Sequence, residues 1–152
     1  MSTEVRLRDG RPEEVGVLTE LQRRAAMVWE EDRAILEAHP EAVAVPLDAV
    51  RERRVRVAAA PDDTPLGFAL VLPVTEGECE LDALFVEPVL HGRGLGRRLL
   101  EDVAARVRAA GARELFVVSG PGAVGFYERA GFRPVGEVPT AFGPAHQLAR
   151  AL

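Results

Sequence analysis

The central part of the sequence reads LFVEPVLHGRGLGRRLL from Leu84 to Leu100. An apolar segment typical of a buried strand leads into a glycine-rich loop, and the loop leads directly into an amphipathic helix. This arrangement directs the free backbone N–H groups and the positive dipole end of the helix at the end of the strand. The sequence therefore predicts an anion site at this point.

Three glycines, Gly92, Gly94 and Gly96, occupy alternate positions of this loop. Without Cβ atoms they allow a phosphate to approach the backbone, and the arginines of the same segment add counter-charge. The spacing fits neither of two common nucleotide sites. A Rossmann fingerprint needs G-x-G-x-x-G, and a P-loop needs a lysine, which this chain lacks. We therefore expect a pyrophosphate of another kind.

The length, composition and charge of the chain limit the classes of protein to which it can belong. The chain has 152 residues, 47% hydrophobic and 28% charged, which suits one globular domain over residues 1–152. Its net charge of -5 divides unevenly: residues 1–90 carry 10 arginines and 19 acids, and residues 91–152 carry 9 arginines and 5 acids. The acidic first part argues against a nucleic-acid partner, whereas the basic second part permits a local anion site.

The single cysteine, Cys79, excludes an intrachain disulfide and a cysteine-rich zinc module. The histidines are scattered, so no metal is expected. The first residues are charged and lack the apolar core of a signal peptide, and glycine and proline interrupt the longest apolar run, residues 66–74. We expect a cytoplasmic protein with no membrane partner.

Hydrophobic periodicity predicts an α/β fold. Strands are expected at residues 5–7, 55–57, 66–74, 79–86, 115–118, 132–138 and about 142–149. Helices are expected at residues 12–28, 30–38, from 46 onward, 95–110 and 123–130. The predicted architecture is a single-domain mixed, largely antiparallel sheet flanked by helices, two of which cross over between strands.

Two motifs resemble those of the GCN5-related N-acetyltransferase (GNAT) superfamily. The acetyl-CoA signature Gln/Arg-x-x-Gly-x-Gly/Ala falls on His91 to Gly96, and an aromatic-Tyr-x-x-x-Gly-Phe run falls on Phe126 to Phe132. The element order also matches, so the resemblance covers nearly the whole chain. His91 stands where the family usually has Gln or Arg, and Gly120 where many members have Asn.

The resemblance implies an acetyl-CoA-dependent N-acetyltransferase that acetylates a primary amine of a small molecule or peptide in a ternary complex. The pantetheine arm of acetyl-CoA would pair with backbone groups between two parting strands. The cofactor-binding residues it implies are Leu84, Phe85, Val86, His91, Gly92, Arg93, Gly94, Leu95, Gly96, Arg97, Arg98, Ser119, Phe126 and Tyr127. No metal is implied.

The same resemblance suggests catalytic groups. Tyr127 matches the residue that commonly gives a proton to the leaving sulfur. Glu80 lies six residues before Val86, where the histone-modifying branch has its catalytic glutamate. Asp82 is the second candidate base and shares the strand face of Glu80 unless a bulge intervenes. The alternative interpretation is that both are ordinary exposed carboxylates. Cys79 should face the other way, so we expect no acetyl-enzyme.

The acceptor site is expected on the first helices, where Trp29, Glu30 and Asp32 combine a ring with carboxylates that suit a cationic amine. A small polyamine-like molecule or a basic peptide is the favoured acceptor. Two alternatives stay open: a non-catalytic acyl-CoA-binding or regulatory module, and transfer of a longer acyl group or transfer to oxygen. A homodimer is also left open.

Overall fold

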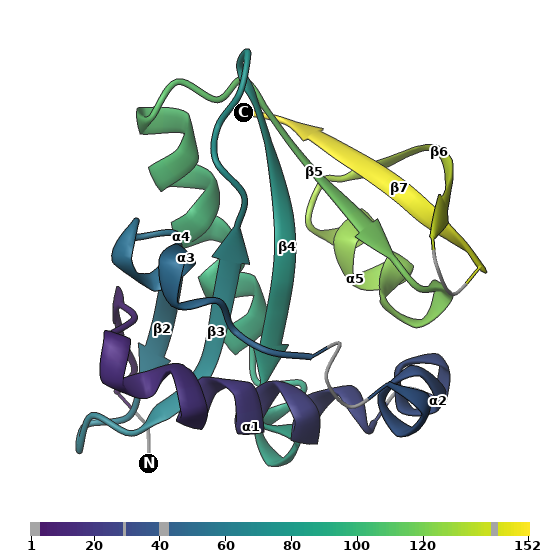
Figure 1. The fold of residues 1–152 in the computed structure, drawn as a ribbon. Helices are drawn as coiled ribbons and strands as arrows, with labels where there is room; N and C mark the ends of the chain where they lie inside the picture. The colour runs from purple at the N-terminus through teal and green to yellow at the C-terminus, as the bar shows by residue number, and fades with distance from the viewer. Residues whose placement is uncertain (1–3, 29, 40–42, 141–142) are drawn as a thin grey trace.

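The computed structural model describes residues 4–28, 30–39, 43–140 and 143–152. The strands are β1 (Arg6–Asp9), β2 (Val55–Ala59), β3 (Pro65–Val71), β4 (Glu78–Val86), β5 (Glu114–Ser119), β6 (Arg133–Thr140) and β7 (Gly143–Ala151). The helices are α1 (Val15–Ala26), α2 (Glu30–Ala38), α3 (Leu47–Arg51), α4 (Leu95–Ala109) and α5 (Val124–Arg129), with 3-10 turns η1 (Pro12–Glu14), η3 (Pro88–Leu90) and η4 (Pro121–Ala123). This order confirms the expected one (Figure 1).

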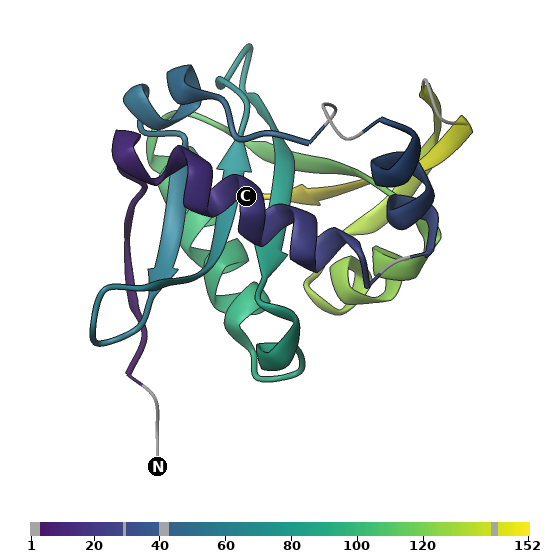
Figure 2. The same ribbon diagram turned by 60° about the horizontal axis from the view of Figure 1, so that its bottom comes forward.

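The described strands form one sheet in the order β1-β2-β3-β4-β5-β7-β6. Neighbouring strands are antiparallel except for the central pair β4 and β5, which is parallel. Helices α1 and α3 cover one face and helices α4 and α5 the other (Figures 1 and 2). The mixed, mostly antiparallel sheet predicted from the sequence is confirmed.

Strands β4 and β5 pair over only part of their length. Facing residues run from Glu78 and Glu114 to Leu81 and Val117, and beyond these the two strands part (Figure 1). Strand β4 stays paired with β3 as far as Val86, so the edge of residues 82–86 that faces β5 is left without a strand partner. Unpaired strand edges are sites at which an extended ligand can add as a strand.

Helix α4 is held against the sheet by one apolar stripe. Leu99, Leu100, Val103 and Val107 are buried, each stabilising the fold by about 1.5–3 kcal/mol. They belong to one core cluster, the α4-side cluster, that also contains Cys79, Leu81 and Val86 of β4. This packing fixes the first turn of α4 next to the end of β4.

A second core cluster, the α1-side cluster, lies on the other face. It includes Leu18 and Leu21 of α1, together with Val55, Phe68 and Ala83 of the sheet. Both faces of the central strands are therefore buried, as their largely apolar sequences indicate. None of the described helices is long and apolar enough to span a membrane.

Most elements lie within two residues of their predicted bounds, and two differ by three residues. Strand β3 ends at Val71 rather than near residue 74, because Pro73 has no N–H to donate and the chain turns back toward β4. The helix predicted from residue 12 begins as the 3-10 turn η1, where Pro12 fills the first position.

Candidate functional site

The glycine-rich loop joins the end of β4 to the first turn of α4. Gly92 and Gly94 have φ angles of +80° and +81°, a conformation that residues with a Cβ rarely adopt, and Gly94 is the N-cap of α4. A Cβ at either position would meet no atom of the protein within 4 Å. These glycines are therefore required by the turn, and the space around them is open to a ligand.

The first helical hydrogen bond of α4 runs from the N–H of Arg98 to the carbonyl of Gly94, at 3.0 Å. The N–H groups that precede it, from Gly94 to Arg97, have no partner within the helix. Together with the helix dipole they form a site suited to a phosphate or another anion. The anion site predicted from the sequence thus has the required backbone geometry.

Helix α5 packs against this first turn. A Cβ at Gly96 would lie 3.5 Å from the ring of Phe126, an ordinary contact distance, and Nη1 of Arg97 donates to the carbonyl of Arg129 at 3.2 Å. The motif that contains Tyr127 is therefore placed beside the glycine-rich loop, although the two are about thirty residues apart in the sequence.

The predicted anion-binding side chains point in different directions. Arg97 also pairs with Glu101, and Nη2 of Arg98 donates to the carbonyl of Val5 at 3.3 Å. Arg93 is exposed, and no side-chain partner for it exists in the described part of the chain. Nε2 of His91 hydrogen-bonds the carbonyl of Val86 at 3.0 Å, which ties the loop to the end of β4.

Tyr127 is only 7% exposed. Its ring packs edge-on against Phe126 and Phe132, with ring centroids 5.1 and 5.4 Å apart. Burial raises the pKa of the Tyr127 hydroxyl above its ordinary value. The hydroxyl therefore carries its proton at neutral pH, as a proton donor must, but it is a weaker acid than an exposed tyrosine.

A β-bulge in β4 separates the two candidate bases. Leu81 faces Val71 and Ala83 faces Leu70, so Asp82 is an extra residue in the strand. Residues before the bulge, such as Leu81, pack in the α4-side cluster, whereas Ala83 packs in the α1-side cluster. The simple alternation that would put Glu80 and Asp82 on one face is therefore interrupted by this bulge.

The pKa values of both carboxyl groups are raised above their ordinary values. Burial raises the pKa of Glu80, and the negative charge of Asp82 raises it further. Loss of hydration also raises the pKa of Asp82, although its side chain remains accessible, while the positive charge of Arg54 opposes this rise. A carboxylate with a raised pKa accepts a proton more readily near neutral pH, as a general base must.

Cys79 is unsuited to nucleophilic chemistry. Its side chain is 1% exposed and lies in the α4-side cluster, and burial raises the pKa of its thiol to about 11. The thiolate, which is the reactive form, is scarce at neutral pH. This agrees with the expectation that no acetyl-enzyme forms.

The other predicted residues fall into two groups. Leu84, Phe85 and Val86 lie on the part of β4 that has left β5, and Ser119 is buried at the end of β5, where its Oγ donates to the carbonyl of Gly120 at 2.8 Å. In the predicted acceptor site, Trp29 and the side chains of Glu30 and Asp32 lie outside the described residues.

Two residues near the candidate site were not predicted from the sequence. Arg24 of α1 forms an ion pair with Glu87, which directly follows β4, and so ties the helix on one face to the start of the glycine-rich loop. Arg54, directly before β2, places its charge near Asp82. No sequence signal could have identified either, because both depend on which strands become neighbours.

Comparison with known proteins agrees with this geometry. The model of the acetyltransferase (GNAT) family matches residues 17–132. A peptidyl-lysine N-acetyltransferase, YjaB of Salmonella typhimurium, is 36% identical over 89 residues, which are 59% of this chain and 57% of that protein. The match thus spans little more than half of that relative.

Solved structures share the fold over nearly the whole chain. The PaiA N-acetyltransferase of Thermoplasma acidophilum, in complex with coenzyme A, has a TM-score of 0.77 at 17% identity, covering 98% of this chain and 99% of its own. The apo form of YjaB from Escherichia coli has a TM-score of 0.69 at 28% identity, covering 97% of both chains.

Proposed function

Because the chain belongs to the acetyltransferase (GNAT) family, we propose that it is an acetyl-CoA-dependent N-acetyltransferase that acts on a primary amine. The observation that carries the proposal is the parting of β4 and β5 after Leu81 and Val117, directly beside the glycine-rich N-terminus of α4. An unpaired strand edge and an anion site then lie within one stretch of chain. Acetyl-CoA has an amide-bearing arm and a pyrophosphate that match these two features.

In this proposal the N–H groups from Gly94 to Arg97 hold the pyrophosphate, and Arg93, which has no partner among the described residues, adds counter-charge. The backbone of Leu84 to Val86 pairs with the pantetheine arm. His91 holds the loop in place and does not contact the phosphate, because its ring is hydrogen-bonded to the carbonyl of Val86. Ser119 at the end of β5 and Phe126 of α5 are the proposed cofactor contacts from the other side.

Acetyl-CoA supplies an acetyl group activated as a thioester. Glu80, with Asp82 as the second candidate, removes a proton from the acceptor ammonium, since only the neutral amine has a lone pair with which to attack. The amine forms the new N–C bond and the C–S bond then breaks. Tyr127 donates its proton to the departing sulfur, and the second proton lost by the nitrogen restores the Tyr127 hydroxyl. A backbone N–H of the Leu84–Val86 segment stabilises the developing oxyanion.

The acceptor in this proposal is the side-chain amine of a lysine within a peptide. Support comes from the Salmonella relative, a peptidyl-lysine N-acetyltransferase, and from the carboxylates of Glu80 and Asp82, whose negative charge favours a cationic acceptor. The excess of acidic residues in 1–90 also favours a cationic acceptor. Small polyamines share this charge and belong in the same screen.

The test is release of free coenzyme A from acetyl-CoA in the presence of lysine peptides, polyamines, neutral amines and alcohols. Amine-dependent release with lysine peptides among the best acceptors supports the proposal. Acetyl-CoA binding without release would identify a non-catalytic binding module, and preference for alcohols or longer acyl-CoA donors would identify a different transfer reaction.

A further inference from the structure

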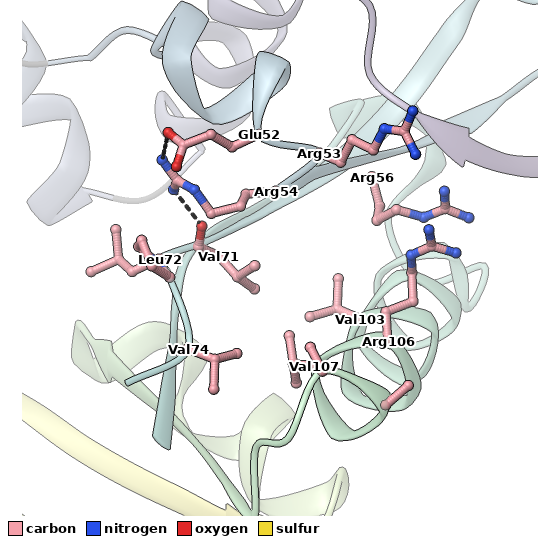
Figure 3. A pocket seen from close by; sticks show the side chains of 13 residues that line it. Glu52, Arg53, Arg54, Arg56, Val71, Leu72, Val74, Val103, Arg106 and Val107 are labelled. Carbon is pink, nitrogen blue, oxygen red and sulfur yellow. Dashed lines mark hydrogen bonds and ion pairs between the residues drawn. The ribbon is translucent and has the colours of Figure 1, made fainter. Parts of the chain in front are cut away.

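A pocket of about 540 Å³ lies at the end of the sheet opposite the glycine-rich loop. Its walls come from residues 52–54 between α3 and β2, from Arg56 of β2, from residues 71–74 at the end of β3, and from the last turns of α4 (Figure 3). Because α4 begins at the glycine-rich loop and ends at this pocket, the full length of the helix separates the two sites. The volume suits a small organic molecule.

Most of the wall is apolar. Val71, Leu72 and Val74 line one side and Val103 and Val107 of α4 line the other (Figure 3). Leu72 is 38% exposed, whereas most large apolar side chains of this sheet are buried. The walls therefore favour a ligand with an apolar body, whose transfer from water is favourable.

Three arginines lie together on one side of the pocket. Figure 3 shows the guanidinium groups of Arg53, Arg56 and Arg106 directed to the same side of the pocket. Arg56 is already paired with Asp9 at 2.9 Å and with Asp102 at 2.8 Å. Arg106 makes only a 3.8 Å contact with Asp9, and Arg53 has no side-chain partner among the residues that the structure describes. Positive charge is thus left over at the opening.

The fourth arginine of the lining, Arg54, is directed to the other side of the pocket (Figure 3). Arg54 donates from Nη1 to the carbonyl of Val71 at 2.8 Å and pairs through Nη2 with Glu52 at 3.2 Å. Its Nε atom is buried and has no hydrogen-bond partner in the described part of the chain.

We propose that this pocket binds a small organic carboxylate with an apolar chain or ring. The carboxylate lies at Arg53 and Arg106, and the apolar body lies against Val71, Val74 and Val107. The proposal is independent of the acetyltransferase activity, because none of the residues proposed to bind acetyl-CoA lines this pocket.

The first test is NMR titration of the protein, without acetyl-CoA, with hexanoate, hexanamide and hexylamine. Hexanoate is expected to shift the backbone amides of Leu72, Val74 and Ala110 and to bind roughly tenfold more tightly than the two uncharged or cationic analogues. Shifts confined to Gly92 and Gly94, or equal binding of hexanamide, would overturn the proposal.

A matched pair of double variants tests whether the arginines at the pocket bind the carboxylate. Arg53→Ala with Arg106→Ala removes two arginines from the opening, and Arg51→Ala with Arg108→Ala removes two exposed arginines from the neighbouring turns without touching the pocket. Only the first variant is expected to weaken hexanoate binding, by roughly tenfold. Equal weakening by both would show general charge attraction and contradict a defined site.

Discussion

Leu81 of β4 and Val117 of β5 are the last facing residues of the parallel pair, and beyond them the two strands part. Both side chains are buried in the α4-side cluster, so the two strands are held together at this point. Each strand remains paired on its other side, β4 with β3 and β5 with β7. The gap between β4 and β5 is therefore part of the folded sheet, and both strands stay hydrogen-bonded on their other sides.

Tyr127 offers a direct test of proton donation. We expect Tyr127→Phe to lower kcat roughly tenfold or more while KM for acetyl-CoA changes little, because the ring packing is kept and only the hydroxyl is lost. Steady-state kinetics checks this, and the melting temperature shows whether the core is intact. Unchanged turnover would remove Tyr127 from the mechanism.

The two candidate bases can be separated because the bulge places Asp82 outside the regular alternation of β4. Glu80→Gln is expected to lower kcat by on the order of a hundredfold near neutral pH, with partial recovery in alkaline buffer, where more of the acceptor amine is neutral. Asp82→Asn is expected to have the smaller effect and to move the acidic limb of the pH–rate profile to lower pH, since its charge raises the pKa of Glu80. A larger loss in Asp82→Asn would reverse the assignment.

The left-handed conformation of Gly94 leads to a prediction with an internal control. Gly94→Ala and Gly111→Ala both put a Cβ at positive φ, +81° and +102°, where it meets no neighbouring atom. Each should destabilise the fold by roughly 1–2 kcal/mol. Only Gly94→Ala is expected to raise KM for acetyl-CoA, by roughly tenfold, because Gly111 lies beyond the far end of α4. Equal KM values in the two variants would separate the loop from cofactor binding.

The acid stability of the fold depends on Asp63, which joins the turn between β2 and β3 to β1. Its carboxylate pairs with Arg11, Arg6 and Arg8, which lower its pKa to about 2. A lowered pKa stabilises the folded state above the unfolded value of ~3.9, and this contribution disappears as the pH falls toward 2.

We therefore expect Asp63→Asn to be less stable than the parent chain in urea at pH 7 and nearly as stable at pH 2. Asn tolerates the positive φ of +75° at this position, so the backbone is not the cause. A difference in stability that does not change with pH would contradict the role of the charge.

The sequence predicted the parts of this structure that depend on local chemistry. Helix α2 has the predicted bounds, 30–38, because its ends are set by local signals. The loop around Gly94 was predictable because positive φ and a helix N-terminus leave a glycine pattern. The packing of Cys79 opposite Glu80 followed from strand alternation.

The remaining features depend on contacts between distant segments. The bulge at Asp82 arises from its register with β3, which no pattern within β4 specifies. The point at which β4 leaves β5 is likewise a property of the pair. Arg98 was predicted to add charge to the anion site, yet its side chain reaches the carbonyl of Val5, a residue far away in the sequence.

The most direct test of the account is a crystal structure of this chain with coenzyme A. We expect the pyrophosphate at the backbone N–H groups from Gly94 to Arg97, and the pantetheine arm along the unpaired edge of β4 at Leu84 to Val86. Glu80 and Tyr127 should then lie on opposite sides of the terminal sulfur. Coenzyme A bound elsewhere, such as in the arginine-lined pocket at the other end of α4, would contradict it.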